Sequence, residues 1–530
     1  MRRKKTMNWF IFFILSCFIF CEGESWAEAG GFFDTLQKNL EKNLVINGRI
    51  KNETAIRLQD GPDNSFFGWA PARYMIFSNP GKYPAREGEE RGEFTKIENR
   101  FDLKVRYNIS SNAYLYWICR TVYDAVYEAE NLEKPRIQNK NREFDFSPLR
   151  ELYLDFTIGK FYARLGRQQV VWGKTDGIKM LDVVCPMSLE EGLLDDFEDS
   201  RIPLWMFNLN YKFTPEYNLQ LLWILEFKHN YIPAYGQEFF PYMGQFERTP
   251  LIDVYNLYRA YDLLPPFLQP LVHRPTLTAL RSEEPEPFHN IHKESIFGFR
   301  FEGLWKGFFF ALNYLHTYDM FPTIYSNVAI APNPFDPGLP PNIDVTLTTK
   351  YPRLDIFGIA FDKDVWFNTI LRGEMAYYKG DTFPTTDPKD SDGVKRSDQL
   401  QYALGLDHFF FRDYFTSFQL IQMIIPNNFD RSRKLCDDMY GSRLAPLDRV
   451  RTYLTLLCKA DFMHESLYPE ILLIYGANNG EWNIRPKVLY KVTDNFFARW
   501  GFDIFSGEYN DPFGQFNRKD RVFFELEYNF

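Results

Sequence analysis

The chain has 530 residues, a formal net charge of -9, an aromatic content of 18% and a mean hydropathy of -0.36. An acidic chain with scattered Lys and Arg gives no basic surface for nucleic acid, which excludes that class of partner. Beyond residue 20 no apolar run reaches about 18 residues, which excludes a helical membrane span in that part of the chain. The many apolar side chains alternate with charged ones instead.

The first 29 residues have the three parts of a secretory signal peptide. Residues 2–5 are basic, residues 9–20 are apolar, and Ala27-Glu28-Ala29 forms a cleavage site with small residues. A lipoprotein site at Cys17 is the alternative, but it would leave a very short apolar segment. We therefore expect an exported protein that begins near residue 30.

The last ten residues, RVFFELEYNF, alternate between apolar and polar side chains. Such alternation predicts a strand with one apolar and one polar face. The same pattern recurs along the chain, for example over residues 101–109, 151–158, 205–213 and 297–302.

The links between these predicted strands alternate between short and long. Short links are expected at 110–112, 159–160, 213–217, 303–307, 362–365, 411–414, 460–466 and 493–495, and the stretches between them are long and rich in Pro, Gly and Asp. Tight turns at one end and large loops at the other are typical of an outer-membrane barrel. We predict an all-β, transmembrane antiparallel barrel over residues 44–530 with about 18 strands, or about 16 if the segments at 467–476 and 481–492 are not strands.

The closing strand gives the barrel two predicted membrane contacts. Tyr528 and Phe530 share the apolar face, where aromatic rings favour the boundary between hydrocarbon and headgroups. A terminal aromatic residue also resembles the insertion signal of outer-membrane proteins. The expected partners are therefore outer-membrane lipid and the barrel-assembly machinery.

Three segments depart from the strand pattern. Apolar residues at helical spacing predict a short amphipathic helix over residues 30–43, packed on the barrel mouth. Residues 229–293 form a long loop in which Thr249–Leu271 has helical spacing. Residues 174–203 form a loop that we expect to fold inward and constrict the lumen.

Residues 163–211 resemble a family of proteobacterial outer-membrane barrels known only as a domain of unknown function. That family also resembles the alginate-export porins in its general form. The shared residues are Gly166, Arg167, Gln168, Trp172, Gly173, Asp182, Pro186, Arg201, Pro203 and Trp205. This sequence has Cys185 where we would expect Asn before the Pro. The resemblance implies passage of a hydrophobic or amphipathic compound across the outer membrane.

Charged residues of the loop suggest how a constriction would act. The loop carries Asp195, Asp196, Glu198 and Asp199, and the predicted wall carries Arg164, Arg167, Arg300 and Arg372. Opposed charges at a narrow point would orient a polar solute. The alternative is that these pairs, with Asp182 and Arg201, only hold the loop in place.

Other side chains give weaker indications. His289 and His292 lack the further ligands of a metal site, and Asp430, Asp437 and Asp438 lack the spacing of a calcium loop. Cys119 and Cys458 are expected to be free thiols, and a Cys185–Cys436 bridge is the most plausible disulfide. We expect no cofactor and no metal.

The sequence thus predicts a channel for a small, hydrophobic or amphipathic solute. The alternatives are a barrel-borne lipid or ester hydrolase, for which His316 or His408 would be the base, and a structural barrel with periplasmic or lipoprotein partners. No local nucleophile accompanies either histidine, which favours the channel.

Overall fold

The computed structural model describes residues 42–60, 90–130, 144–232, 238–239, 276–331, 342–384, 392, 394–411, 413–426, 448–507 and 511–530. Within these ranges, no helix has the length and apolarity needed to cross a bilayer. The predicted signal peptide, Thr249–Leu271, the three aspartates near residue 435 and nearly all of the predicted helix over 30–43 lie outside them.

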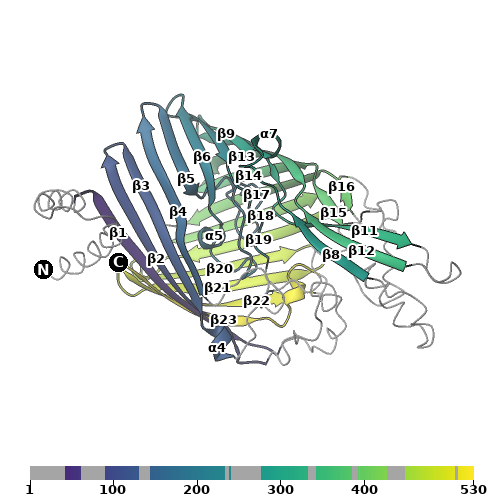
Figure 1. Ribbon diagram of the computed structural model, residues 1–530. Helices are drawn as coiled ribbons and strands as arrows, with labels where there is room; N and C mark the ends of the chain where they lie inside the picture. The colour runs from purple at the N-terminus through teal and green to yellow at the C-terminus, as the bar shows by residue number, and fades with distance from the viewer. Residues whose placement is uncertain are drawn as a thin grey trace, which may run out of the picture.

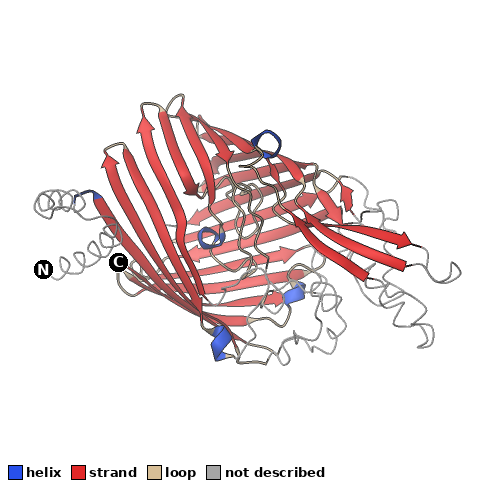
Figure 2. Cartoon of the chain, viewed as in Figure 1, coloured by secondary structure: helices blue, strands red, loops and turns tan. Residues whose placement is uncertain are grey.

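Eighteen strands form one closed antiparallel barrel (Figures 1 and 2). They are β1 Leu44–Arg57, β2 Phe94–Ser110, β3 Ala113–Asp124, β4 Phe144–Ile158, β5 Phe161–Gln168, β6 Leu204–Lys212, β7 Tyr217–Ile224, β9 Ile296–Trp305, β10 Phe308–Tyr318, β13 Arg353–Trp366, β14 Thr369–Lys379, β17 Gln399–Phe410, β18 Tyr414–Ile424, β19 Val450–Ala460, β20 Leu467–Gly476, β21 Glu481–Lys491, β22 Phe496–Ser506 and β23 Arg521–Asn529. The predicted fold class and the larger strand number are confirmed, including the two uncertain strands β20 and β21.

Pairing of β1 with β23 closes the barrel, from Arg49 opposite Asn529 to Arg57 opposite Arg521. Closure leaves no free strand edge, so the backbone N–H and C=O groups of every strand can be hydrogen-bonded within the barrel, as hydrocarbon requires. Large apolar side chains such as Phe299, Leu312 and Phe357 are exposed on the outer face, and charged side chains such as Asp102 are buried on the inner face. This is the arrangement of a transmembrane barrel of the outer-membrane type.

The short links are tight turns. Between β9 and β10, Lys306 and Gly307 both have positive φ, and between β13 and β14 Phe367 and Asn368 do. Two positive φ values are typical of hairpin turns that match strand twist. The prediction of a turn at 362–365 is wrong, because the alternating pattern of β13 continues to Trp366 and Asp362 faces the lumen within it.

The long connections carry smaller elements at the loop end. β8 Thr276–Glu283, β11 Thr323–Ala331 and β12 Asn342–Lys350 form a three-stranded sheet, and β15 Thr382–Pro384 pairs with β16 Val394–Arg396. The three-stranded sheet projects from the barrel on the side away from both termini (Figure 1). Short helical segments are α4 Val126–Ala129, α5 Phe197–Ser200, α7 Ile291–Glu294 and the 3-10 turn Gly514–Phe516.

Cys185 does not form the disulfide that the sequence made most plausible, and Cys436 lies outside the described residues. Cys185 is a free, buried thiol whose sulfur lies 3.4 Å from the backbone nitrogen of Val170. Burial inside the β5–β6 loop raises the pKa of this thiol to about 12, because the thiolate would lose its hydration. Cys119 and Cys458 are also free.

Candidate functional site: the inward loop

The connection between β5 and β6, residues 169–203, folds into the barrel. Figure 1 shows α5, which belongs to this loop, in the middle of the barrel interior. The inward fold expected from the sequence is confirmed. Polar anchors, apolar clusters and further ion pairs join the loop to the wall.

The first anchor is Trp172, next to strands β7 and β9. Its indole nitrogen donates a hydrogen bond to the Gln220 side chain at 2.8 Å. Its carbonyl accepts a hydrogen bond from Arg300 at 3.0 Å, while Arg300 also bonds Glu302. Arg300, predicted to face a loop carboxylate, therefore holds loop backbone instead.

The second anchor joins the loop to strands β14 and β18. Arg372 donates to the Lys174 carbonyl at 2.8 Å and contacts the Asp176 carboxylate. Gln419 on β18 donates to the same carboxylate at 2.7 Å. Arg372 also lies 3.2 Å from Asp407. This wall arginine does pair with a loop carboxylate, but with Asp176 rather than with the predicted acidic run.

Apolar contacts support both anchors. Leu181 and Val184 pack with Leu315, Ile356 and other inward side chains of β6, β7, β10, β13 and β14 in one buried cluster. Met180 and Leu194 pack in a second cluster that includes Ile421 and Ile474. Full burial of each such side chain contributes about 1.5–3 kcal/mol. The loop is therefore an integral part of the barrel core.

The third anchor is Asp199, which lies among three arginines of β1, β2 and β3. Arg49, Arg100 and Arg120 each approach its carboxylate to 2.8 Å. Asp102 on β2 bridges Arg49 and Arg120 from the wall side, at 2.6 Å to each. The arginines hold the pKa of Asp199 well below its usual range, because they stabilise the carboxylate more than burial opposes it.

The rest of the acidic run lies beside the same region. Asp195 is 3.4 Å from Lys96 on β2, and Asp196 is 3.2 Å from Arg499 on β22. At Glu198 and Arg201 it is the backbone carbonyls that accept hydrogen bonds, from Arg150 on β4 at 3.1 Å each. The structure thus brings Asp195, Asp196 and Asp199 to wall cations.

Two predicted wall partners lie elsewhere. Arg164 faces the lumen but pairs with its strand neighbour Asp155 at 3.0 Å. Arg167 has the outward parity of Phe161 and bonds the carbonyls of Leu149 and Pro203. The predicted pairing of the acidic run with Arg164, Arg167, Arg300 and Arg372 is therefore wrong, because alternation along a strand does not show which strand lies across the lumen.

Asp182 and Arg201 pair with each other within the loop. The Arg201 guanidinium is 2.8 Å from Asp182, and Lys179 is 2.7 Å from the same carboxylate oxygen. Both side chains are buried, and a short bridge between Met187 and Arg201 crosses the loop next to them. This pair braces the loop internally, which matches the structural alternative for these two residues.

The family-signature residues shape the ends of the loop. Gly166 has φ +135, and a Cβ there would lie 2.2 Å from the Leu152 carbonyl; a Cβ on Gly173 would lie 2.7 Å from the Asp182 nitrogen. The Gln168 side chain donates to the Arg164 carbonyl and accepts from Asn208. The Pro186 carbonyl accepts from Ile202, the Pro203 carbonyl accepts from Arg167, and Trp205 on β6 lies opposite Arg167.

Sequence reasoning missed the cations that hold the acidic run, namely Arg49, Lys96, Arg100, Arg120 and Arg499. A signal for part of the set was present. Lys96 and Arg100 have the same parity as Asp102 in β2, so extending that strand toward its N-terminus would have placed them in the lumen.

The histidines of the enzyme alternative lie on the outer parity. His316 lies 2.6 Å from Asp355, but its second nitrogen contacts Arg353 rather than a hydroxyl. Thr369 lies 2.7 Å from His408, and within the described ranges no carboxylate contacts that ring. Neither site joins a nucleophile, a base and an orienting group. His289 is a surface residue beside Glu286.

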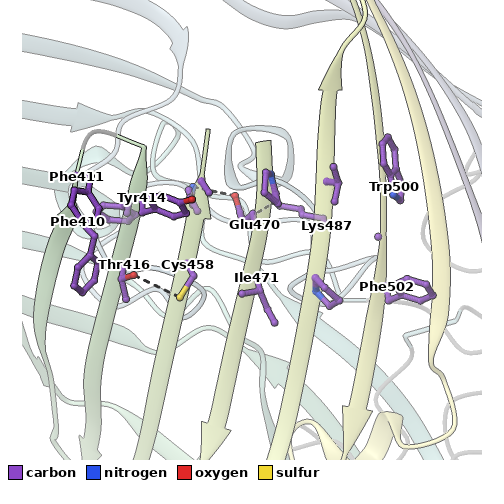
Figure 3. Close-up of a pocket in the computed structure, with 17 residues that line it drawn as sticks. Phe410, Phe411, Tyr414, Thr416, Cys458, Glu470, Ile471, Lys487, Trp500 and Phe502 are labelled. Atoms are coloured by element: carbon purple, nitrogen blue, oxygen red, sulfur yellow. Dashed lines mark hydrogen bonds and ion pairs between the residues drawn. The ribbon is translucent and has the colours of Figure 1, made fainter. Parts of the chain in front are cut away.

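A separate hollow of about 850 Å³ lies in the wall over β18 to β22 (Figure 3). Phe410 and Tyr414 border one side, Trp500 and Phe502 the other, and most of its lining side chains have the outward parity. On the inward parity of the same strands, Glu470 lies between Lys459 and Lys487, at 3.2 and 3.1 Å. The hollow is apolar and faces the hydrocarbon, so it is not part of the loop site.

A closed barrel with an apolar outer wall and a loop fixed in its lumen defines an outer-membrane-type β-barrel of porin architecture. The chain belongs to the family described as protein of unknown function (DUF1302), which matches residues 27–530. No curated protein is significantly similar to it in sequence.

The chain is also similar to solved structures, each at low sequence identity. OccAB2 of Acinetobacter baumannii is 10% identical, with 92% of this chain and 98% of that chain covered and a TM-score of 0.45. OccK1 (OpdK) of Pseudomonas aeruginosa is 10% identical, with 92% and 99% covered and a TM-score of 0.46. A BenF-like porin from Pseudomonas fluorescens Pf-5 is 9% identical, with 92% and 98% covered and a TM-score of 0.45.

Proposed function

We propose that this protein is an outer-membrane channel that passes a small amphipathic solute through a lumen narrowed by residues 169–203. The observation that carries the proposal is the anchoring of this loop by strands on several sides of the barrel. Anchors on β1, β2, β3, β7, β9, β14 and β18 surround it, so the loop crosses the lumen and is fixed there.

The narrowed lumen has the charges that a selective channel uses. Arginines and lysines of the wall pair with carboxylates of the loop, so a solute that passes beside these pairs meets both signs of charge. The same ion pairs then fix the loop and define the charge pattern of the lumen. No cofactor enters this mechanism.

Reconstitution of the purified protein into planar lipid bilayers tests the proposal. We expect discrete current steps in salt solution, because an aqueous path beside the loop conducts ions. Hydrolysis of a lipid or ester substrate by folded protein that gives no current steps would instead support the enzyme alternative and would overturn the channel.

A further inference from the structure

The lumen wall on the turn side of the loop carries a group of aromatic and basic side chains that the loop does not use. Arg106, Tyr114, Tyr116, Tyr153, Tyr162 and Arg164, from β2 to β5, share the inward parity. We call this group the tyrosine–arginine shelf. Pairing across the strands sets Arg106, Tyr116 and Tyr153 in one row, and Tyr114, Asp155 and Arg164 in the next.

Planar groups in the shelf stack on one another. The Arg106 guanidinium lies 4.0 Å from the Tyr114 ring centre, and the Arg164 guanidinium lies 4.3 Å from that of Tyr153. Tyr116 and Tyr153 have ring centres 5.2 Å apart. Such stacks favour a further planar ring, because aromatic faces attract cations and the edges of other rings.

A buried carboxylate fixes part of the shelf. Asp155 accepts hydrogen bonds from the hydroxyls of Tyr114 and Tyr162, at 2.9 and 2.5 Å, and from Arg164 at 3.0 Å. These bonds neutralise Arg164 and hold the rings in place. The shelf is therefore preorganised, which lowers the entropy cost of binding.

Arg106 is the second cation of the shelf, and among the described residues it has no carboxylate partner. Its side chain is exposed to the lumen, and among the described residues the only hydrogen-bond partner of that side chain is the side chain of Asn108, through the Nε atom at 3.0 Å. The two terminal nitrogens are thus available for a bidentate pair with a carboxylate. Lys104, next along the inward face of β2, adds positive charge to the same part of the lumen.

We propose that the tyrosine–arginine shelf binds a planar aromatic carboxylate on its way through the channel. The carboxylate pairs with Arg106 and the ring packs on Tyr116. This inference rests on the proposed channel function, for which it names the class of solute.

The test is isothermal titration calorimetry on the full-length protein in detergent, with benzoate, cyclohexanecarboxylate, benzyl alcohol and glucose. We expect benzoate to bind at least about 10-fold more tightly than cyclohexanecarboxylate, which lacks an aromatic face, or benzyl alcohol, which lacks the charge. Glucose binding as tightly as benzoate, or no benzoate binding, would overturn the proposal.

Variants locate the site. Arg106→Gln and Tyr116→Leu should each weaken benzoate binding about 10-fold, while Lys212→Gln, which removes a lumen charge outside the stack, should leave it unchanged. If Arg106→Gln does not fold, Arg106→Lys keeps the charge without the planar fork and should still weaken binding. An equal effect of Lys212→Gln and Arg106→Gln would reject the shelf in favour of general charge attraction.

Planar-bilayer currents separate this inference from the proposed function. A protein that conducts but does not bind benzoate refutes only the shelf. A protein that binds benzoate but never conducts refutes the channel.

Discussion

At the scale of single residues, Asp199 connects the loop to the wall. Its three arginines come from three neighbouring strands, and one of them, Arg49, lies 150 positions away in the chain. Removing one member of a buried ionic group leaves the others without compensation and costs about 3–5 kcal/mol. The neighbouring anchors at Trp172 and Arg372 are independent of this group.

Asp199→Asn should therefore loosen one end of the loop while the barrel stays folded. We expect single-channel currents with frequent fluctuations, measured in planar bilayers, where the parent gives steady steps. Asp494→Asn, at an exposed turn between β21 and β22, is the matched control and should behave as the parent does. Steady currents from Asp199→Asn would show that this carboxylate does not hold the loop.

The lowered pKa of Asp199 predicts how the channel responds to acid. Because folding lowers the pKa of this carboxyl, its ion pairs stabilise the protein fully at every pH above the ordinary Asp pKa of about 4. That stabilisation is lost only as the pH falls through the lower pKa of the folded state. The difference in steadiness between the parent and Asp199→Asn should thus persist in a series from pH 8 down to about pH 4. Loss of that difference near pH 6 would contradict this assignment.

At the scale of elements, the seam between β1 and β23 closes the barrel. The backbone of Phe530 exchanges two hydrogen bonds with Gly48, and its ring covers that glycine. A Cβ at position 48 would lie 2.1 Å from the ring. The terminal aromatic residue therefore needs a glycine opposite it, and the ring also stacks with Phe101 and Tyr528.

Gly48→Val should displace the Phe530 ring and destabilise the seam by about 1–3 kcal/mol, as overpacking does. Urea titration of the detergent-folded barrel measures this effect. The folded fraction at each urea concentration is read from gel mobility, because the folded barrel and the heat-unfolded chain migrate differently. Ile46→Val, on the same face of β1, is the control and should change the midpoint little. Unchanged stability of Gly48→Val would mean that the ring does not pack here in solution.

Much of the architecture could be predicted from periodicity, because a strand with one face in hydrocarbon and one in water must alternate. Parity alone places Arg164 and Asp102 inside and Tyr528 outside. It could not show that Asp199 meets β1 to β3, since which strand lies across the lumen depends on closure of the whole barrel. The prediction of a turn at 362–365 was wrong for a related reason. Asp362 is a lumen-facing strand residue that pairs with Lys174 of the loop, and the sequence alone did not show this partner.

At the scale of the whole molecule, eighteen strands enclose more space than side chains of the wall fill. The β5–β6 loop occupies part of it with two apolar clusters and an ionic group, and leaves the tyrosine–arginine shelf on the turn side. The proposed channel therefore depends on one property of the molecule, that this loop sets the narrowest part of an aqueous path.

Replacing residues 176–199 with a short Gly-Ser linker tests that claim most directly, by single-channel conductance in planar bilayers. Removal of these residues should raise the conductance of each current step well above that of the parent, because the barrel wall alone then limits the current. Equal step sizes in the two folded proteins would contradict the account.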